Sequence, residues 1–230
     1  MKKINFPLVV IMLVAFAAAN FAGKNPSKEA PIAIVMKIVK DVNFKKGEEG
    51  AWAAIKIGQA LATGDEIKTG AKSLALIKFT DNSILRVREN CTIKIYADKN
   101  NKQVSKNTYI SKGDVNFEVT KQQNEEFQFT TPTMVASIRG TKGLIGVEDD
   151  GSSSLLVEEG SVDFMSTVGD QKKGNVRGGN FAQVDKEGQV DEGAISADLQ
   201  KKLESSKKTN TKKIIIQTNQ GNLIIEYLEE

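Results

Sequence analysis

The chain has 230 residues, 40% of them hydrophobic and 27% charged, so it can bury a sizeable core and does not have the composition of a disordered protein. Its 32 basic residues nearly balance its 29 acidic ones, which gives no reason to expect a nucleic acid partner. The absence of histidine and the single cysteine exclude histidine-based catalysis, a zinc site of paired cysteines and an internal disulfide.

The first residues are typical of an export signal. Lys2 and Lys3 precede an apolar run over residues 8–19 that is short for a membrane span, and small residues follow it. We expect a signal peptide over residues 1–22, with an uncleaved anchor as the alternative, and a flexible, proline-containing lead-in over residues 23–31. The sequence therefore predicts an exported protein, periplasmic or at the cell surface, with no stable membrane span after cleavage.

Residues 32–193 are predicted to form many short strands. Apolar and polar residues alternate in a series of runs separated by turn residues, at 75–79, 85–87, 93–95, 115–119, 127–129, 155–157 and 162–164. The polar run over residues 98–107 is expected to be a solvent-facing loop. Cys91 shares the parity of Ile93 and Ile95, which predicts a buried, inert thiol, with an intermolecular disulfide as the alternative.

A weak internal repeat marks places where strands meet. Residues 110–117 (ISKGDVNF) match residues 157–164 (VEEGSVDF), and Gly178 and Gly179 precede a looser copy. Glycine is the residue that lets a chain bend with positive φ, so we expect these glycines at corners. The sequence thus predicts an all-β domain of stacked short strands, in the form of a β-roll, a sandwich or a solenoid-like domain.

The character of the chain changes after Gly193. Ser196 suits the N-cap of a short helix, expected over residues 194–206, with Ile195, Leu199 and Leu203 on one side. A basic linker over residues 207–213 and a C-terminal β-hairpin over residues 214–230 are expected to follow. This hairpin is too apolar to stand alone in water. Deleting residues 207–230 is expected to leave the β-domain folded.

Because the chain lacks histidine, pairs of carboxylates are the remaining candidates for acid–base catalysis. Four such pairs fall at predicted turns: Glu48-Glu49, Glu125-Glu126, Asp149-Asp150 and Glu158-Glu159. Adjacent residues on a strand point to opposite faces, so we expect solvated charges here and not an acid–base pair. A hydrolase built from acids distant in sequence stays open as an alternative. Residues 149–151 lack the acidic spacing of a calcium loop, and we predict no metal, no cofactor and no catalytic residue.

Five motifs, in one order over residues 33–190, resemble the FecR domain family. They are residues 64–70 (GDEIKTG), 79–83 (FTDNS), 113–119 (GDVNFEV), 129–141 (FTTPTMVASIRGT) and 155–162 (LLVEEGSV). Family members usually carry an aromatic residue shortly after Arg-Gly-Thr, whereas residues 142–144 (KGL) stand here, so this strand is expected to pack differently. The resemblance implies an extracytoplasmic all-β domain.

The resemblance also singles out signature residues as candidate interaction residues: Gly64, Asp65, Thr131, Pro132, Arg139, Gly140 and Thr141. Proline, glycine and threonine suit structural roles at turns, which we favour for Pro132, Gly140 and Thr141. Arg139 could instead present its guanidinium to a carboxylate-bearing or glycan-linked ligand.

The family takes its name from a membrane-spanning regulator that senses a loaded iron–siderophore receptor and controls a sigma factor. Few residues precede the apolar run here, so direct anti-sigma activity is not expected. The resemblance instead implies a non-enzymatic module that binds an envelope protein or a cell-wall polymer. A regulatory component that relays an outer-membrane signal by protein contact is the first alternative, and an envelope glycan hydrolase is the second.

Residues 213–226 (KIIIQTNQGNLIIE) carry a fainter resemblance, to the first hairpin of cyclophilin-type prolyl isomerases. The catalytic arginine and aromatic residues of those enzymes lie beyond that hairpin. The resemblance implies either a generic hairpin or the remnant of a fused domain, and in both cases no isomerase activity.

Overall fold

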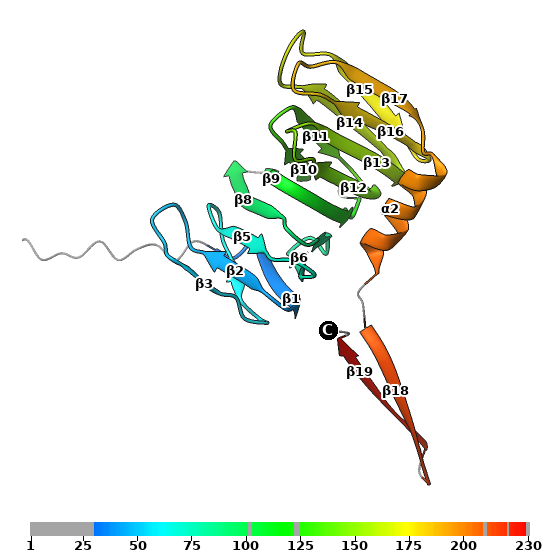
Figure 1. Ribbon diagram of the computed structural model, residues 1–230. Helices are drawn as coiled ribbons and strands as arrows, with labels where there is room; N and C mark the ends of the chain where they lie inside the picture. Colours follow the sequence, from blue (N-terminus) through cyan, green and yellow to red (C-terminus); the bar gives the residue numbers. More distant parts are fainter. Residues whose placement is uncertain (1–29, 101–102, 122–124, 209–210, 220, 229–230) are drawn as a thin grey trace, which may run out of the picture.

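The computed structural model describes residues 30–100, 103–121, 125–208, 211–219 and 221–228 (Figure 1). The expected signal peptide over residues 1–22 and nearly all of the lead-in lie outside the described residues. The described part consists of strands with one helix and a separate C-terminal hairpin, which confirms the all-β prediction.

Two sheets face each other and form the main domain. Sheet A contains, in spatial order, β4 (Ala60–Leu61), β1 (Ala33–Val39), β6 (Leu74–Phe79), β7 (Ile84–Val87), the second part of β9 (Gln103–Glu118), β12 (Lys142–Val147), β13 (Ser153–Glu159), β16 (Asn180–Val184) and β17 (Val190–Ala194). Sheet B contains β3 (Trp52–Ala54), β2 (Val42–Lys45), β5 (Glu66–Thr69), β8 (Thr92–Asn100), the first part of β9, β10 (Glu125–Thr130), β11 (Met134–Ile138), β14 (Ser161–Ser166) and β15 (Lys173–Arg177). Strand β9 belongs to both sheets, and it pairs parallel with β10.

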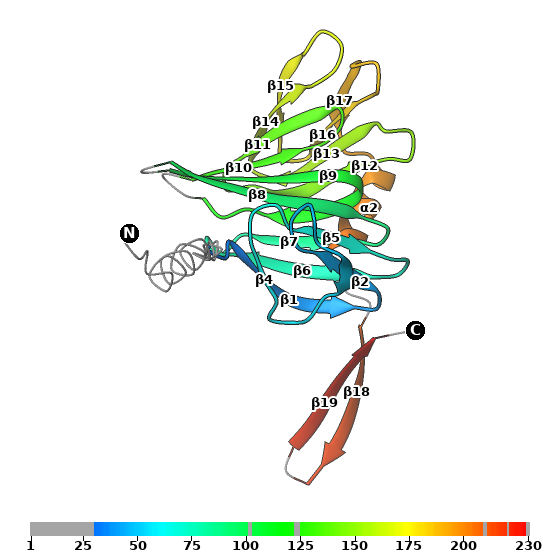
Figure 2. The ribbon, with the colours of Figure 1, turned by 90° about the vertical axis from the view of Figure 1, so that its left-hand side faces the viewer.

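From β10 onward the chain alternates between the sheets in hairpins. The hairpins β10–β11 and β14–β15 lie in sheet B, and β12–β13 and β16–β17 lie in sheet A. Each new hairpin pairs with the previous one in the same sheet, through β11–β14 and β13–β16. The stack therefore grows one hairpin at a time, as Figure 2 shows from the side.

The core lies between the two sheets. Alternate residues of nearly every strand point inward, and their side chains form one continuous cluster that includes five phenylalanines. The rings of Phe79 and Phe127 meet edge to face with 5.0 Å between centroids, and those of Phe117 and Phe129 lie 5.1 Å apart. Aromatic pairs of this kind add to the free energy gained by burial of apolar area. The two-sided strands that the sequence predicted are thus present.

The chain crosses between the sheets at corners with positive φ. The expected glycines occupy four of these positions, at Gly113, Gly140, Gly160 and Gly179. Three further corners place Lys40, Lys72 and Asn90 at φ between 53° and 56°. Residues other than glycine are strained at positive φ, so these three must be held in place by neighbouring corners. The backbone amides of Gly70 and Asn90 each donate a hydrogen bond to the preceding corner of the stack.

The expectation of a loop over residues 98–107 is wrong. Strand β8 extends to Asn100 and β9 begins at Gln103, so most of this run forms the arms of one long hairpin. Its polar composition resembles that of a loop, but the backbone hydrogen bonds of the ladder hold it extended. One residue of the run, Lys106, is fully buried.

Cys91 is buried, as its parity predicted, and lies at the corner next to Gly113. Burial raises the pKa of its thiol, because the thiolate would lose its hydration. We expect Cys91 to resist a thiol reagent such as DTNB in the native protein and to react fully in denaturant. Rapid labelling of the native protein at mildly alkaline pH would contradict this placement.

Helix α2 (Ala197–Lys207) covers part of the outer face of sheet A (Figure 1). Its N-cap is Ser196, whose Oγ accepts a hydrogen bond from the Leu199 amide at 3.3 Å. Leu203 packs on Leu144 and Leu156 and forms a second, smaller core with them. The strand that departs from the family pattern after Thr141 is therefore covered by α2 through Leu144.

A two-stranded C-terminal hairpin, β18 (Thr211–Thr218) with β19 (Gly221–Leu228), follows α2. We use this name for both strands together. Figures 1 and 2 show it projecting past the end of the domain at which β1 and β2 lie. It pairs with no other strand in the described part of the chain.

Candidate functional site

The signature residues Gly64 and Asp65 close the turn that precedes β5. The Asp65 carboxylate accepts hydrogen bonds from the amides of Ala62 at 2.8 Å and Gly47 at 3.1 Å. The Gly64 amide donates to the carbonyl of Ile95 at 2.7 Å, and Gly64 has a φ of +84°. Asp65 is nearly fully buried, so this part of the signature positions backbone.

Thr131 and Pro132 lie in the turn between β10 and β11, where buried hydroxyls connect the two sheets. The Thr131 Oγ1 accepts from the Met134 amide at 2.9 Å and from the Ser153 hydroxyl of sheet A at 2.7 Å. The carbonyl of Pro132 accepts from the Thr167 hydroxyl at 2.8 Å. Because Thr131 and Ser153 are buried, this network holds the sheets together and does not face a ligand.

Arg139, Gly140 and Thr141 form the corner from β11 to β12. The Thr141 hydroxyl donates to the carbonyl of Ser161 at 3.0 Å, and its own carbonyl accepts from the Val119 amide. Gly140 has a φ of +67°, and a Cβ there would approach Lys121 to 2.8 Å. Arg139 alone of these three is exposed. It borders a small hollow together with Asp81, Glu126 and Phe127.

A buried ion pair beside this hollow was not predicted. The Lys106 Nζ of β9 lies 2.6 Å from the Asp81 carboxylate in the turn between β6 and β7, and their side chains are 1% and 3% exposed. The pair therefore joins sheet B to sheet A across the edge of the core. A signal existed, because Lys106 shares the parity of the buried residues Thr108 and Ile110.

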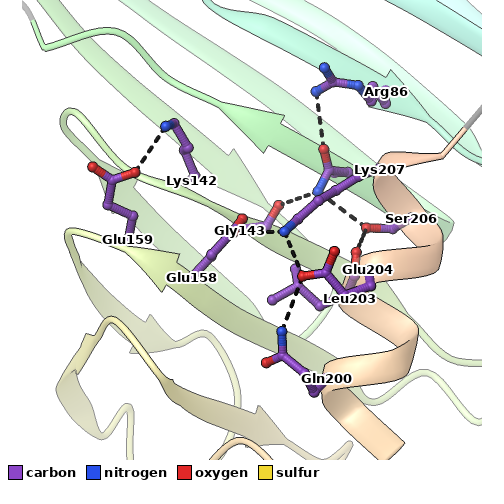
Figure 3. A network of polar contacts seen from close by, with 11 residues as sticks. Arg86, Lys142, Gly143, Glu158, Glu159, Gln200, Leu203, Glu204, Ser206 and Lys207 are labelled. Carbon is purple, nitrogen blue, oxygen red and sulfur yellow. Dashed lines mark hydrogen bonds and ion pairs between the residues drawn. The ribbon is translucent and has the colours of Figure 1, made fainter.

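A second polar network fixes α2 on sheet A, and Figure 3 shows it from close by. Asn116 of β9 is buried between them, and its Nδ2 donates to the Gly143 carbonyl and to the Ser206 hydroxyl, each at 3.1 Å. Its Oδ1 accepts from Arg86 at 3.2 Å. Lys207 lies 2.6 Å from Glu158 and 2.8 Å from Glu204, so the last turn of α2 is tied to β13.

Lys202 ties the middle of α2 to the same sheet. Its Nζ lies 2.8 Å from Glu148 and 3.1 Å from Asp114. Burial raises the pKa of Asp114, although Lys202 opposes this rise. Burial would lower the pKa of Lys202, but Asp114 and Glu148 together raise it. Lys202 is therefore a charged anchor of the helix.

Replacing Asn116 with alanine is expected to lower the free energy of unfolding by about 2 kcal/mol, because Gly143 and Ser206 lose a buried partner. Cleavage after the lysines of α2 should then accelerate in limited trypsin proteolysis. Asn175→Ala removes an exposed, hydrogen-bonded asparagine and is the matched control. Equal effects of the two substitutions on thermal unfolding would contradict the role given to Asn116.

Several acidic side chains around α2 contact lysines. A shallow hollow of about 200 Å³ is bordered by Arg86, Glu118, Lys142, Glu158 and Lys207. Glu158 contacts Lys207 while its neighbour Glu159 contacts Lys142 at 2.9 Å, so this predicted pair points to two different lysines (Figure 3). Among the described residues, no three acidic or cysteine side chains gather in a way that could hold a metal ion.

Two sets of apolar side chains are exposed, and the sequence predicted only the second of them, in the C-terminal hairpin. The first is a set of exposed side chains at one end of the domain, Ile34 and Met36 of β1, Trp52 of β3 and Ile57 of the following turn, which are 40–67% exposed. The second is the C-terminal hairpin, whose aliphatic side chains from Ile214 to Ile224 are 44–58% exposed. Exposed apolar clusters commonly mark interaction surfaces in soluble proteins. No helix in the described ranges is both long and apolar enough to cross a membrane.

Comparisons with known proteins give one family. The FecR protein family model matches residues 65–163, within the span of the motifs that resemble this family. Two crystal structures of a proposed anti-sigma factor from Parabacteroides distasonis, at 1.65 Å and 2.50 Å, are similar with a TM-score of 0.49 and 12% identity. This chain aligns over 58% of its own length and spans 61% of theirs. A comparison with curated proteins finds no match.

Proposed function

We propose that this FecR-domain protein is an extracytoplasmic regulatory component that senses a signal at the cell envelope and relays it by protein contact. The observation that carries the proposal is the match of the FecR family model to residues 65–163. Those residues run from β5 into β14 and form the centre of both sheets. The feature shared with the family is thus the scaffold of the domain itself.

The charged contacts support binding over catalysis. Glu158 and Glu159 each hold a separate lysine, and Asp81 holds the buried Lys106. Each of these carboxylates is thus already in contact with a lysine of the same chain. These contacts support a non-enzymatic role, in which exposed side chains such as Arg139 and the two exposed apolar sets meet other proteins.

We further propose that residues 1–22 direct export and that the FecR-like domain over residues 32–193 folds without the C-terminal hairpin. Lys207 and the carbonyl of Lys208 contact the domain, the latter through Arg88 at 2.7 Å. A truncation that removes residues 209–230 keeps these contacts, so it should change the melting temperature of the domain little. A large loss of thermal stability would contradict this division, and sequencing the mature N-terminus tests the export signal.

Deletion of the gene in the source bacterium tests the regulatory role. If the protein is a sensor, a defined set of transcripts should change when the gene is deleted. Their levels should return when the full chain is restored, but not when a chain without residues 1–22 is supplied. Unchanged transcripts would contradict it. A static module for wall polymer predicts instead that the purified chain sediments with isolated sacculi while transcripts stay constant.

Arg139 offers a sharper version of the same test. If its guanidinium contacts a carboxylate of the partner, Arg139→Ala should abolish the transcriptional response while the domain stays folded. Arg177→Ala is the matched control, since Arg177 is also exposed and lies two residues before the corner glycine Gly179. An equal loss of response in both variants would remove Arg139 from the contact.

A further inference from the structure

Helix α2 rests on sheet A through a small apolar contact. Leu203 is fully buried there, and it packs on Leu144 of β12 and Leu156 of β13. Leu199 of the helix and Ile195 before it are only partly covered. This cluster lies on the outer face of sheet A and is separate from the core between the two sheets. A free helix of eleven residues is marginal in water, so α2 stays helical because it is docked.

Ion pairs that reach the solvent supply further attachments of α2. Lys202 contacts Glu148 and Asp114, and Lys207 contacts Glu158. These five side chains are 28–47% exposed. Ion pairs with this much exposure contribute little to stability, and dissolved salt screens them. The attachment of α2 should therefore be weaker than that of the strands below it, and it should weaken further as the salt concentration rises.

The part of sheet A beneath α2 does not depend on the helix for its own hydrogen bonds. Strand β12 pairs with β9 on one side and with β13 on the other. Asn116, which bonds to Ser206 of the helix, also donates to the Gly143 carbonyl and accepts from Arg86. Both of these contacts lie within the sheet, so Asn116 keeps its place when the helix leaves (Figure 3).

A buried hydroxyl on the outer face of sheet A favours an open state. Ser154 of β13 lies two residues before Leu156, so its side chain points to the same face of the sheet. Its Oγ is buried and has no hydrogen-bond partner in the described part of the chain. A buried hydroxyl without a partner costs free energy, and this cost is removed when water reaches the group.

We propose that α2 is a strap, which detaches from sheet A as a unit while the stack of hairpins stays folded. The contacts of Lys202 and Lys207 set how often it detaches, and salt shifts the balance toward the open state. Release uncovers Leu144 and Leu156, together with the carboxylates that the two lysines hold. The inference goes beyond the proposed regulatory role and does not depend on it.

Hydrogen exchange of the full chain tests the strap without any substitution. The hydrogen-bonded amides of α2 should exchange at least about 100-fold faster than those of β12 and β13 beneath them. Raising NaCl from about 0.05 M to about 0.5 M should speed exchange in the helix severalfold and leave the strands unchanged. Equal protection of helix and strands would overturn the proposal, because α2 would then open only with the whole domain.

Thiol labelling compares the space under α2 with the core in a single molecule. Ser206→Cys places a thiol beneath the helix, and the buried Cys91 is the internal reference. The new thiol should react with DTNB at least about tenfold faster than Cys91, after each rate is divided by that of the same thiol in denaturant. Equal corrected rates would contradict the strap.

Two adjacent lysines of α2 show whether charge holds the strap. In the Ser206→Cys chain, Lys202→Met should speed labelling of the new thiol severalfold without changing Cys91, because it removes the contacts with Glu148 and Asp114. Lys201→Met is the matched control, since the Lys201 side chain is 82% exposed, and it should change neither rate. Equal effects of the two substitutions, or labelling of Cys91 that accelerates in step, would overturn the proposal.

Discussion

Replacing Asp81 with asparagine is expected to lower the free energy of unfolding by up to about 3–5 kcal/mol, because it takes the Asp81 carboxylate away from the buried Lys106 ammonium. The two side chains are 1% and 3% exposed and 2.6 Å apart. Asparagine preserves the acceptor for the Ser83 amide, which bonds to the Asp81 Oδ1 at 2.9 Å, so the turn itself should survive. Urea unfolding gives the change directly.

The double variant separates the ion pair from its surroundings. Lys106→Met combined with Asp81→Asn removes both charges, and it should cost less than the sum of the single substitutions. The pair Lys112–Asp149, at 2.7 Å but with side chains 57% and 88% exposed, is the matched control, and Asp149→Asn should cost at most about 1 kcal/mol. Similar costs at the two sites would show that burial does not determine the strength of the pair.

Replacing Gly113 with alanine should cost about 2–4 kcal/mol, since two unfavourable terms add there. Gly113 has a φ of +82°, and a Cβ would lie 2.7 Å from the Cα of Cys91 in the neighbouring corner. Gly151→Ala isolates the first term, because Gly151 has a φ of +87° but open space around its Cβ position. That control should cost about 1 kcal/mol.

Thermal or urea unfolding of the two glycine variants measures the difference. The excess for Gly113 reports the close contact between stacked corners, because the backbone strain is nearly equal in both. Alanine tolerated equally at Gly113 and Gly151 would mean that the corners are free to separate. It would also contradict the tight packing inferred around Cys91.

Local signals in the sequence predicted local structure well. Ser196 begins α2, and Ile195, Leu199 and Leu203 face the domain, because helix caps and helical spacing are properties of a few neighbouring residues. The same holds for the alternating strands and for Gly113, where a glycine suffices to form a corner. A glycine is not required at a corner, however. Lys72 also forms a corner with positive φ, and nothing in the sequence around it predicts this.

Contacts between distant residues could not be predicted from the pattern. Asn116 and Ser206 are ninety residues apart in sequence, and only the placement of α2 on sheet A brings them together. The polar neighbours of Lys106 predict a loop, although its parity in the strand points inward. The motifs identified the positions of the signature residues but not their contacts. The structure shows that Asp65 and Thr131 bind backbone or buried hydroxyls.

The alternation of hairpins between the sheets has an evolutionary consequence. Each hairpin from β10 to β17 is hydrogen-bonded to the previous one in its own sheet, so a duplicated segment that contains one hairpin for each sheet could be inserted without disturbing the register of those before it. Length variation among homologous genes should therefore fall in whole pairs of hairpins, and the corner glycines should recur with the same period.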